Sequence, residues 1–591
     1  MCGIAAISRG ALTLELVEKN NRWAAIVAAA LAHRGPDGQG QSADASLVHR
    51  RLAIIDPQGG QQPLYHEDIT LVGNGEIYNY LELIAEHGLK DLPSASDFEP
   101  ILRLYQTDPN FLQQLRGMYA LAIKKEEKLL LARDPFGIKP LYYAKNEDGE
   151  LMAASEPRAL LAAGFGIKKA DEGIANQLLH LNYSTGKYSI YPGIYRLLPG
   201  ESLWVENGEI IEKKRQHPLA IKPANIPTDE QEALARLNVL LEESVVLHQR
   251  SDVPYGLFLS SGIDSSVLLT MMARVNERPV KSFTCGFVGE GVPDERPAAE
   301  KLANSLKAEH QEISFSAEDF WQFLPIIAHA LDEPTADYAI LPSWKLAGLA
   351  AQSVKVVLSG EGGDEIFGGY GRYRRAMRPW WLGGRAADPQ GHHQASQFCR
   401  RSGRDWLDNW QKEATAFHLP EWSPLQKAQG SDIATWLPHD LLLKLDRCLM
   451  VHGLEGRTPY LDAQLSPFAF YLPDELKIKN KMGKYLLRSW LAKHAPQAQP
   501  FAPKKGFTVP VLGWMQSKQK FLAERLPGLD IIQHLMHPEK VAWLFNHLEE
   551  QYAGLAWSIL FFAVWHAVHI EGVNPQGDVE RVLRKASWSS Y

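Results

Sequence analysis

The feature that most constrains the fold is a change of residue pattern about a third of the way along the chain. From Cys2 to about Glu212, short apolar runs such as "CGIAAIS" and "ITLVGNGEIYN" alternate with turn residues, as is typical of β-strands. Residues 213–230 contain three prolines and show no periodicity. The pattern therefore predicts a sheet-rich domain over residues 2–212, a linker over 213–230 and a second domain over 231–591.

The second domain opens with a different arrangement. Apolar residues at helical spacing follow a capping signal at Thr228 and Asp229, and then comes "PYGLFLSSGIDSSVLLTMMAR", which has the pattern of strand, glycine turn and helix. The segment "VKVVLSGEGGDEIFGGY" repeats the strand and turn, and helical patterns dominate after about Tyr373. We expect an α/β domain with a parallel sheet covered by helices, followed by a mainly helical C-terminal part.

Composition narrows the class of protein. The net charge of -7 gives no support for a nucleic-acid partner, and the four cysteines contain no CxxC pair that would indicate zinc or a disulfide framework. The most apolar run, "LAWSILFFAVWHAVH", is about 15 residues long and falls short of a membrane helix, so we expect a buried helix there. No secretory signal precedes the first strand, which favours a cytoplasmic protein that binds no membrane.

Cys2 directly follows the initiator methionine. A lone cysteine is usually a small buried apolar residue. If Met1 is removed, however, the α-amine and the thiol belong to one residue, and the amine can accept the thiol proton. Position thus makes Cys2 a candidate nucleophile that needs no histidine.

Several motifs accompany this cysteine in a fixed order. They are "HRGPDGQG", "HRRLAIIDPQGGQQPL", "NGEIYNY", "SDFE" and "RDPFGIKPLYY". With the N-terminal "CGI" they resemble the glutamine amidotransferases that use an N-terminal nucleophile, and in particular the glutamine-hydrolysing asparagine synthetases. The resemblance extends over nearly the whole chain and implies that the first domain is an α+β sandwich of antiparallel sheets.

The resemblance also implies roles for residues of the first domain. Arg51 would hold the glutamine α-carboxylate, as a planar guanidinium fork can. Glu76 and Asp97 would face the α-ammonium and neighbouring donors. Asn74 and the backbone N–H of Gly75 would form the oxyanion hole. The implied glutamine-binding set is Arg51, Leu52, Ala53, Ile54, Ile55, Asn74, Gly75, Glu76 and Asp97. Taken alone, "NG" indicates a hairpin turn and Arg51 a solvated surface charge.

A second site is indicated by "LSSGIDSS", residues 259–266, between a strand and a helix. Backbone N–H groups at a helix N-terminus bind anions, and the segment lacks the Gly-Lys-Ser/Thr ending of a Walker loop. It looks like the pyrophosphatase loop of ATP-dependent ligases that release AMP and pyrophosphate. Ser261 replaces the usual glycine, which is tolerated only if its backbone is not left-handed. A serine-rich helix cap is the structural alternative.

Two acidic residues follow in the glycine-rich turn "LSGEGGDEIFGGY". Mg²⁺ prefers carboxylate oxygens together with substrate phosphates, and the resemblance assigns metal binding to Asp264 and Asp364. It gives Glu361 a catalytic role in acyl-adenylate formation and ammonia handling, and Lys484 a role in adenylation. A flexible acidic turn and a solvated helix lysine are the alternatives. The implied ATP-binding set is Phe258, Leu259, Ser260, Gly262, Asp264, Ser265, Ser266, Cys285, Ser359 and Gly360.

The resemblance therefore implies an enzyme that forms asparagine from aspartate, ATP and glutamine, with Mg²⁺, through an aspartyl-adenylate and transferred ammonia, and that forms a homodimer. The stretch "LDRCLMVHGLEGRTPYLD" departs from the family at Gly456 and Thr458, where apolar residues are usual. This leaves a relative that acts on another carboxylate, such as a sugar acid or a secondary metabolite, as an alternative. A second alternative is a non-catalytic relative that binds nucleotide.

Overall fold

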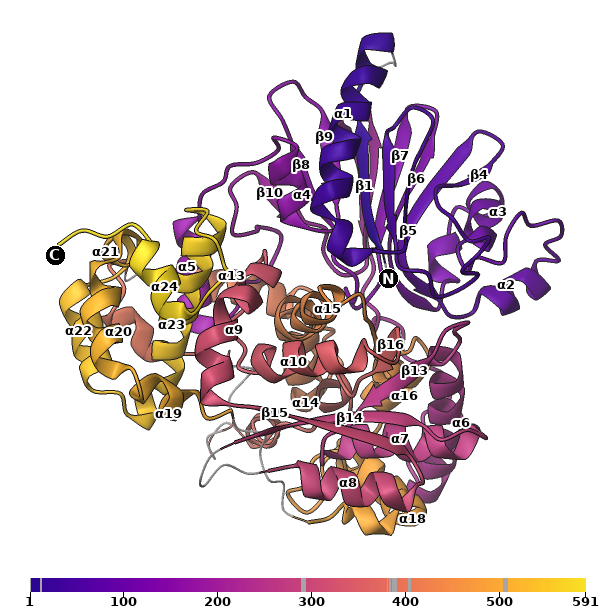
Figure 1. Ribbon diagram of the computed structural model, residues 1–591. Coiled ribbons are helices and arrows are strands. Elements are labelled where there is room, and N and C mark those ends of the chain that lie inside the picture. Colours follow the sequence, from indigo (N-terminus) through magenta and orange to yellow (C-terminus); the bar gives the residue numbers. More distant parts are fainter. Residues whose placement is uncertain are drawn as a thin grey trace.

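A computed structural model describes residues 2–10, 13–288, 294–379, 381, 384, 389, 391–401, 405–502 and 509–590. The described chain forms a sheet-rich N-terminal domain, a parallel-sheet domain and a mass of C-terminal helices (Figure 1). The first domain lies above the other two in Figure 1, and the N-terminal end of the chain lies at the junction between the domains. The predicted fold class is thus confirmed for both domains.

The first domain contains two antiparallel sheets of six strands each. One has the order β10-β8-β9-β1-β3-β2, with bounds β1 Gly3–Ser8, β2 Gly38–Gln41, β3 Leu47–Arg51, β8 Tyr142–Lys145, β9 Leu151–Ala154 and β10 Ile194–Arg196. The other has the order β12-β11-β7-β6-β5-β4, with bounds β4 Leu64–His66, β5 Ile69–Ile77, β6 Gly117–Lys125, β7 Lys128–Arg133, β11 Glu201–Glu206 and β12 Glu209–Arg215.

Strand alternation explains how these sheets stack. Ile4 and Ala6 of β1 pack toward the second sheet, whereas Ala5 and Ile7 pack against helices, because successive side chains of a strand point to opposite faces. The helices that flank the sandwich are α1 Leu14–Ala30, α2 Tyr80–Glu86, α3 Glu99–Thr107 and α4 Pro157–Ala162. The result is a four-layered sandwich, in which α1 and α4 cover one outer face and α2 and α3 cover the other (Figure 1). Helix α5 (Glu172–Leu181) follows these helices in the chain but lies among the C-terminal helices (Figure 1).

Between the domains, β12 ends at Arg215 and helix α6 (Glu230–His248) begins at Glu230. The first three residues of the predicted linker therefore belong to the sheet edge. The predicted cap is present, because the Asp229 carboxylate accepts hydrogen bonds from the backbone N–H groups of Gln231 and Glu232.

The second domain is built on a five-stranded parallel sheet with the order β15-β14-β13-β16-β17. Its strands are β13 Tyr255–Phe258, β14 Lys281–Phe287, β15 Glu309–Phe315, β16 Val356–Leu358 and β17 Glu455–Arg457. One face packs against α6, α7 (Ile263–Val275), α8 (Arg296–Ser305), α16 (Leu465–Tyr471) and α18 (Tyr485–His494). The other packs against α9 (Ala317–Ala330), α10 (Ile340–Ala350) and α15 (Leu442–Met450).

The remaining helices are mostly C-terminal, and those after residue 510 lie at the left of Figure 1. Their bounds are α11 Gly363–Phe367, α12 Tyr373–Ala376, α13 Asp405–Thr415, α14 Pro424–Ala434, α17 Asp474–Lys477, α19 Val511–Gln516, α20 Gln519–Arg525, α21 Asp530–Leu535, α22 Pro538–Asn546, α23 Ala553–His569 and α24 Val579–Lys585. Helix α5 of the first domain packs into the same core as α23. The domains are therefore interlocked in space although they are consecutive in sequence.

Helix α23 contains the apolar run noted in the sequence. With the preceding turn, residues Glu550–His569 are long and apolar enough to span a bilayer, so the expectation that the run is too short was wrong. The most apolar window is 78% buried inside the protein, as a core helix is. The prediction of a buried helix is confirmed.

Candidate active site

Cys2 lies at the start of β1, at the end of the sandwich that faces the second domain (Figure 1). Its backbone N–H donates to Asn74 Oδ1 at 2.9 Å, and its Sγ lies 4.0 Å from the Leu52 carbonyl oxygen. Burial raises the pKa of the thiol, although the nearby amino terminus acts in the opposite direction. Met1, whose removal the sequence interpretation requires, lies outside the described residues.

Asn74 and Gly75 lie inside strand β5 and not in a turn, so the hairpin reading of "NG" was wrong. Gly75 has a φ of 142°, and a Cβ there would lie 1.9 Å from the Met118 carbonyl oxygen of the paired strand β6. Only glycine fits this position. Asn74 is fully buried, and within the described part of the chain its Nδ2 has no hydrogen-bond partner. A buried amide donor is thus available beside the Cys2 backbone.

The last residue of β3, Arg51, and residues 52–55 of the loop after it belong to the predicted glutamine-binding set. Arg51 is buried, and its guanidinium donates to the carbonyl oxygens of Ile55, Asp56 and Pro57 at 2.6–3.2 Å. The surface alternative for Arg51 was therefore wrong. Leu52, Ile54 and Ile55 pack against Val356 and Met450 of the second domain, and Ala53 is also buried.

Glu76 and Asp97 are both buried carboxyl groups. Burial raises the pKa of Glu76 well above its usual value, although Arg457 opposes the rise, and raises the pKa of Asp97 to about 7. Asp97 Oδ2 accepts the backbone N–H of Ile77 at 2.8 Å. Glu76 Oε2 lies 2.9 Å from Arg457 Nη2, so the second domain contributes a cation to this site.

The second predicted site lies at the carboxyl ends of β13, β14 and β16, which are neighbours in the parallel sheet. This edge is where open α/β sheets bind ligands. Residues 259–262 connect β13 to α7, whose backbone N–H groups at the N-terminus point toward the same edge. Ser261 is absent from the residues with positive φ, so the serine is accommodated. This edge carries the predicted residues Phe258, Leu259, Ser260, Gly262, Asp264, Ser265, Ser266, Cys285, Ser359 and Gly360.

Lys484 connects the two acidic residues of this site. Its Nζ forms an ion pair with Asp264 and lies 2.6 Å from Asp364 Oδ1. Lys484 is 4% exposed, so the reading as a solvated helix lysine was wrong. Burial opposes the charge, but Asp264 and Asp364 outweigh it and raise the pKa of Lys484. Its left-handed backbone, with φ 56°, is a strained conformation of the kind found at functional sites.

Glycines allow the loops of this site to approach one another. A Cβ at Gly363 would lie 2.6 Å from Asp264 Oδ1, and a Cβ at Gly369 would lie 1.8 Å from Asp364 Oδ1. The Asp264 and Asp364 carboxylates therefore pack against glycine backbone, and both face the Lys484 ammonium. This donor set also suits a divalent cation shared with phosphate oxygens.

Glu361 lies on the same loop but pairs with a different lysine. Its Oε1 is 3.5 Å from Lys444 Nζ of α15, and burial raises its pKa. Two residues further along α15, Asp446 accepts hydrogen bonds of 2.7 and 3.0 Å from Arg34, whose Nε donates to the Cys2 carbonyl oxygen at 3.2 Å. Helix α15 thus contacts both predicted sites.

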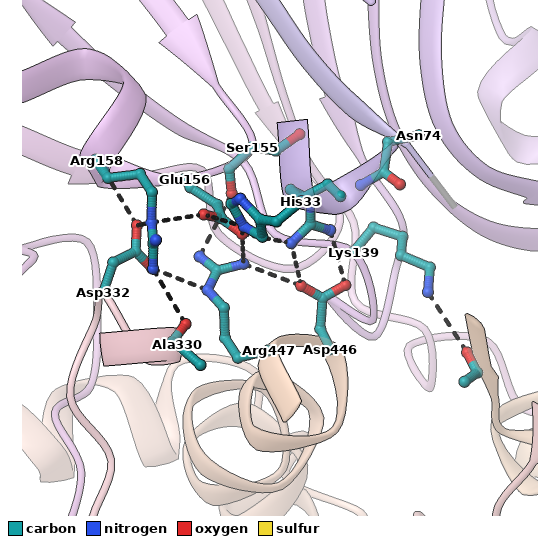
Figure 2. Close-up of polar contacts among 12 residues, drawn as sticks. His33, Asn74, Lys139, Ser155, Glu156, Arg158, Ala330, Asp332, Asp446 and Arg447 are labelled. Carbon is teal, nitrogen blue, oxygen red and sulfur yellow. Dashed lines mark hydrogen bonds and ion pairs between the residues drawn. The ribbon is translucent and has the colours of Figure 1, made fainter. Parts of the chain in front are cut away.

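Part of the contact between the domains is ionic (Figure 2). Three of the ion pairs that cross the interface are Arg34 with Asp446 at 2.7 Å, Glu156 with Arg447 at 3.4 Å and Arg158 with Asp332 at 3.6 Å. Within the first domain, Glu156 also pairs with His33, Arg34 and Arg158. Burial opposes ionisation of Glu156, but the surrounding cations hold its pKa well below the usual range. These residues hold the Cys2 end of the sandwich against α15.

Sequence reasoning missed several of these residues. Arg34, Asp446, Glu455 and Arg457 occur inside the quoted motifs, but no role was assigned to them. Asp337 and Lys444 gave no signal, because a single charge in a helical pattern is usually solvated.

Comparison with known proteins agrees with this arrangement. Residues 236–567 match the asparagine synthase family model, and residues 1–216 match the glutamine amidotransferase domain. The chain is 31% identical to asparagine synthetase [glutamine-hydrolyzing] 1 of Bacillus subtilis, over 97% of both chains. It is 30% identical to asparagine synthetase B of Escherichia coli, over 84% of this chain and 80% of that protein. The chain therefore belongs to the asparagine synthase family and carries a glutamine amidotransferase domain.

Proposed function

We propose that this protein is a glutamine-hydrolysing asparagine synthetase, a ligase that converts L-aspartate, ATP, L-glutamine and water into L-asparagine, AMP, pyrophosphate and L-glutamate. The relatives that match nearly the whole chain carry this activity in their names. The observation that carries the proposal is that α15 touches both sites, through Lys444 beside Glu361 and through Asp446, which binds the Arg34 that contacts Cys2. Two chemically different sites in contact with one helix suit a coupled reaction.

In the first half-reaction, the Cys2 thiol attacks the side-chain amide of glutamine, and the α-amine freed by removal of Met1 takes the thiol proton. The unpartnered Asn74 Nδ2 and the N–H of Gly75 donate to the oxyanion that develops. Arg51 binds the α-carboxylate of glutamine, and Glu76 with Asp97 faces its α-ammonium. The C–N bond of the amide breaks, the α-ammonium returns its proton to the leaving nitrogen, and ammonia leaves. Water then hydrolyses the Cys2 thioester, which releases glutamate and restores the thiol.

In the second half-reaction, the loop over residues 259–266 and residues Ser359 and Gly360 hold ATP. Asp264 and Asp364 would hold Mg²⁺, which would neutralise phosphate charge. The buried Lys484 ammonium lies between these carboxylates and contributes a fixed positive charge where the phosphates bind. The aspartate β-carboxylate attacks the α-phosphorus, and pyrophosphate leaves.

Ammonia from the first site then attacks the acyl-adenylate, and AMP leaves. Glu361 is suited to take a proton from the attacking ammonia, because its side chain lies next to the metal-binding loop and burial raises its pKa. Transfer inside the protein keeps ammonia unprotonated, and only the unprotonated form is a nucleophile. A homodimer and a cytoplasmic location remain predictions of the family resemblance, which size-exclusion light scattering and cell fractionation can check.

The purified protein tests the proposal directly. With aspartate, ATP, Mg²⁺ and glutamine, we expect asparagine, AMP, pyrophosphate and glutamate in equal amounts. A parallel screen of sugar acids and other carboxylates for pyrophosphate release tests the alternative substrates. Pyrophosphate release from one of those acids without asparagine formation from aspartate would contradict the proposed function.

A further inference from the structure

Next to Glu361 lies a pair of charged residues, Asp337 and Lys444, with no role in the mechanism described above. Asp337, just before α10, places Oδ2 at 2.7 Å from Lys444 Nζ. Lys444 is almost fully buried, whereas the Asp337 side chain is 18% exposed and the Glu361 side chain 24% exposed. The two carboxylates are thus partly accessible to a ligand, and the Lys444 ammonium, on a side chain that is 5% exposed, contacts both of them.

This charge arrangement is stable in the folded protein. Burial disfavours the Lys444 ammonium, but Asp337 and Glu361 outweigh that effect and raise the pKa of Lys444, so the lysine is charged at neutral pH. The Lys444 ammonium has three N–H donors. Those not directed to Asp337 or Glu361 can donate to another acceptor. The pair thus offers one anionic and one cationic group next to Glu361.

A neighbouring carboxyl group cannot serve as the anionic group. Asp440 is 3% exposed, its Oδ1 accepts the Thr335 hydroxyl, and its Oδ2 accepts Trp436 Nε1 at 2.5 Å. Burial raises the pKa of Asp440 to about 7. Asp337 is thus the better placed of the two to receive a cation from solvent.

The position of the Asp337–Lys444 pair suits binding of the acceptor and not of the nucleotide. Glu361 lies 3.5 Å from Lys444, and Asp337 and Asp364 both act on it electrostatically, so the Asp337–Lys444 pair and the Asp364–Lys484 pair both lie near Glu361. ATP belongs to the Lys484 side. A ligand on the Lys444 side would meet ATP at Glu361, where the acyl-adenylate is to form.

We propose that Asp337 binds the α-ammonium and Lys444 the α-carboxylate of the acceptor, so that this site selects an α-amino acid over a sugar acid or a simple dicarboxylic acid. The inference rests on the proposed function. A zwitterion matches the pair, because it replaces the Asp337–Lys444 contact with two opposite-charge contacts. An acid without the amino group draws Lys444 toward its carboxylate without supplying Asp337 with a second cation, so it binds less favourably.

Asp337→Asn tests this inference, since it removes the charge and keeps the shape of the side chain. Pyrophosphate release is measured with L-aspartate and with succinate, which lacks only the α-amino group. We expect wild-type protein to prefer aspartate by at least about a hundredfold in kcat/KM. The variant should lose about 10- to 100-fold with aspartate, mainly through KM, and less than about threefold with succinate, as expected for one charged hydrogen bond. The KM for ATP should not change.

Asp319→Asn is the matched control. Asp319 also lies 2.7 Å from a lysine, Lys345, and is 17% exposed, but it lies at the start of α9. The control should keep the wild-type preference for aspartate, and thermal unfolding should show both variants to be folded.

The outcomes separate the inference from the proposed function. Equal losses with aspartate and succinate, or no loss with either, would overturn the inference and leave the proposed function intact. If wild-type protein activates a different α-amino acid, and Asp337→Asn removes its advantage over the des-amino analogue, the inference holds and the proposed function fails.

Discussion

At the scale of single residues, the two polar atoms of the Asn74 side chain differ in their contacts. Its Oδ1 fixes the Cys2 backbone at 2.9 Å, which leaves Nδ2 as a buried donor without a partner within the described residues. A buried donor without a partner costs free energy, so its presence in the ground state suggests that its partner appears during the reaction. In the proposed mechanism, the same side chain positions the nucleophile and donates to the oxyanion.

Asn74→Ala should lower the rate of glutamine hydrolysis by about two to three orders of magnitude, because one oxyanion donor is lost. Glutamate formation from glutamine measures this rate. Asparagine formation from ammonium chloride should stay within about twofold of wild type, since the second site is unchanged. Cys2→Ala serves as the reference for complete loss of glutamine use. A parallel loss of the ammonia-dependent activity would show that Asn74 supports the fold and not the glutaminase chemistry.

Because His49 in β3 is buried, we expect the stability of the folded protein to fall in acid. Burial lowers its pKa from 6.5 to about 3, so between these values the unfolded chain binds a proton that the folded chain does not. Stability is therefore lost as pH falls from 6.5 toward 3. His49→Leu should be relatively more stable than wild type at pH 5.5 than at pH 7.5, by about 1.4 kcal/mol. Urea unfolding at both pH values measures this, and an unchanged difference between the two proteins would refute it.

At the scale of elements, strand β17 joins the two domains through Arg457. Its side chain contacts Glu76 and Glu455 at 2.9 and 2.6 Å, and its backbone carbonyl accepts the Ser359 N–H at 2.8 Å. One strand residue therefore touches the predicted glutamine site with its side chain and the predicted ATP loop with its backbone. Helix α15 makes the second such connection.

Arg457→Met should destabilise the protein by about 3–5 kcal/mol, because the fully buried Glu76 and Glu455 lose their cation. Unfolding in urea measures the loss. Lys214→Met is the control, since Lys214 pairs with Glu212 at 2.8 Å on the exposed strand β12 and should cost less than about 1 kcal/mol. Similar effects of both substitutions would contradict the buried role of Arg457.

These elements also mark the limit of what the sequence could predict. Strand, turn and helix patterns placed the loop at residues 259–262 and the cap at Asp229, because these depend on local residues. Motif order indicated Cys2, Asn74 and Asp364. The pairing of Arg34 with Asp446, or of Glu76 with Arg457, depends on how two domains dock, and no local pattern encodes it. "NG" failed as a turn signal because the geometry of Gly75 is set by its β6 neighbour Met118.

At the scale of the whole molecule, the central claim is that one chain makes ammonia at Cys2 and uses it beside Glu361. The domain interface supports it, since the ionic cluster in Figure 2 and the apolar contacts of Leu52 with Val356 and Met450 hold the two domains against each other. Helix α5 packs with α23 and so joins the first domain to the C-terminal helices.

An isotope experiment tests this claim most directly. The protein is given aspartate, ATP, Mg²⁺ and glutamine labelled with ¹⁵N in the side-chain amide, in the presence of excess unlabelled ammonium chloride, and the asparagine is analysed by mass spectrometry. We predict that the asparagine amide carries ¹⁵N far above its share of the mixed ammonia pool. Asparagine labelled only to the level of that pool, or no asparagine at all, would contradict the claim.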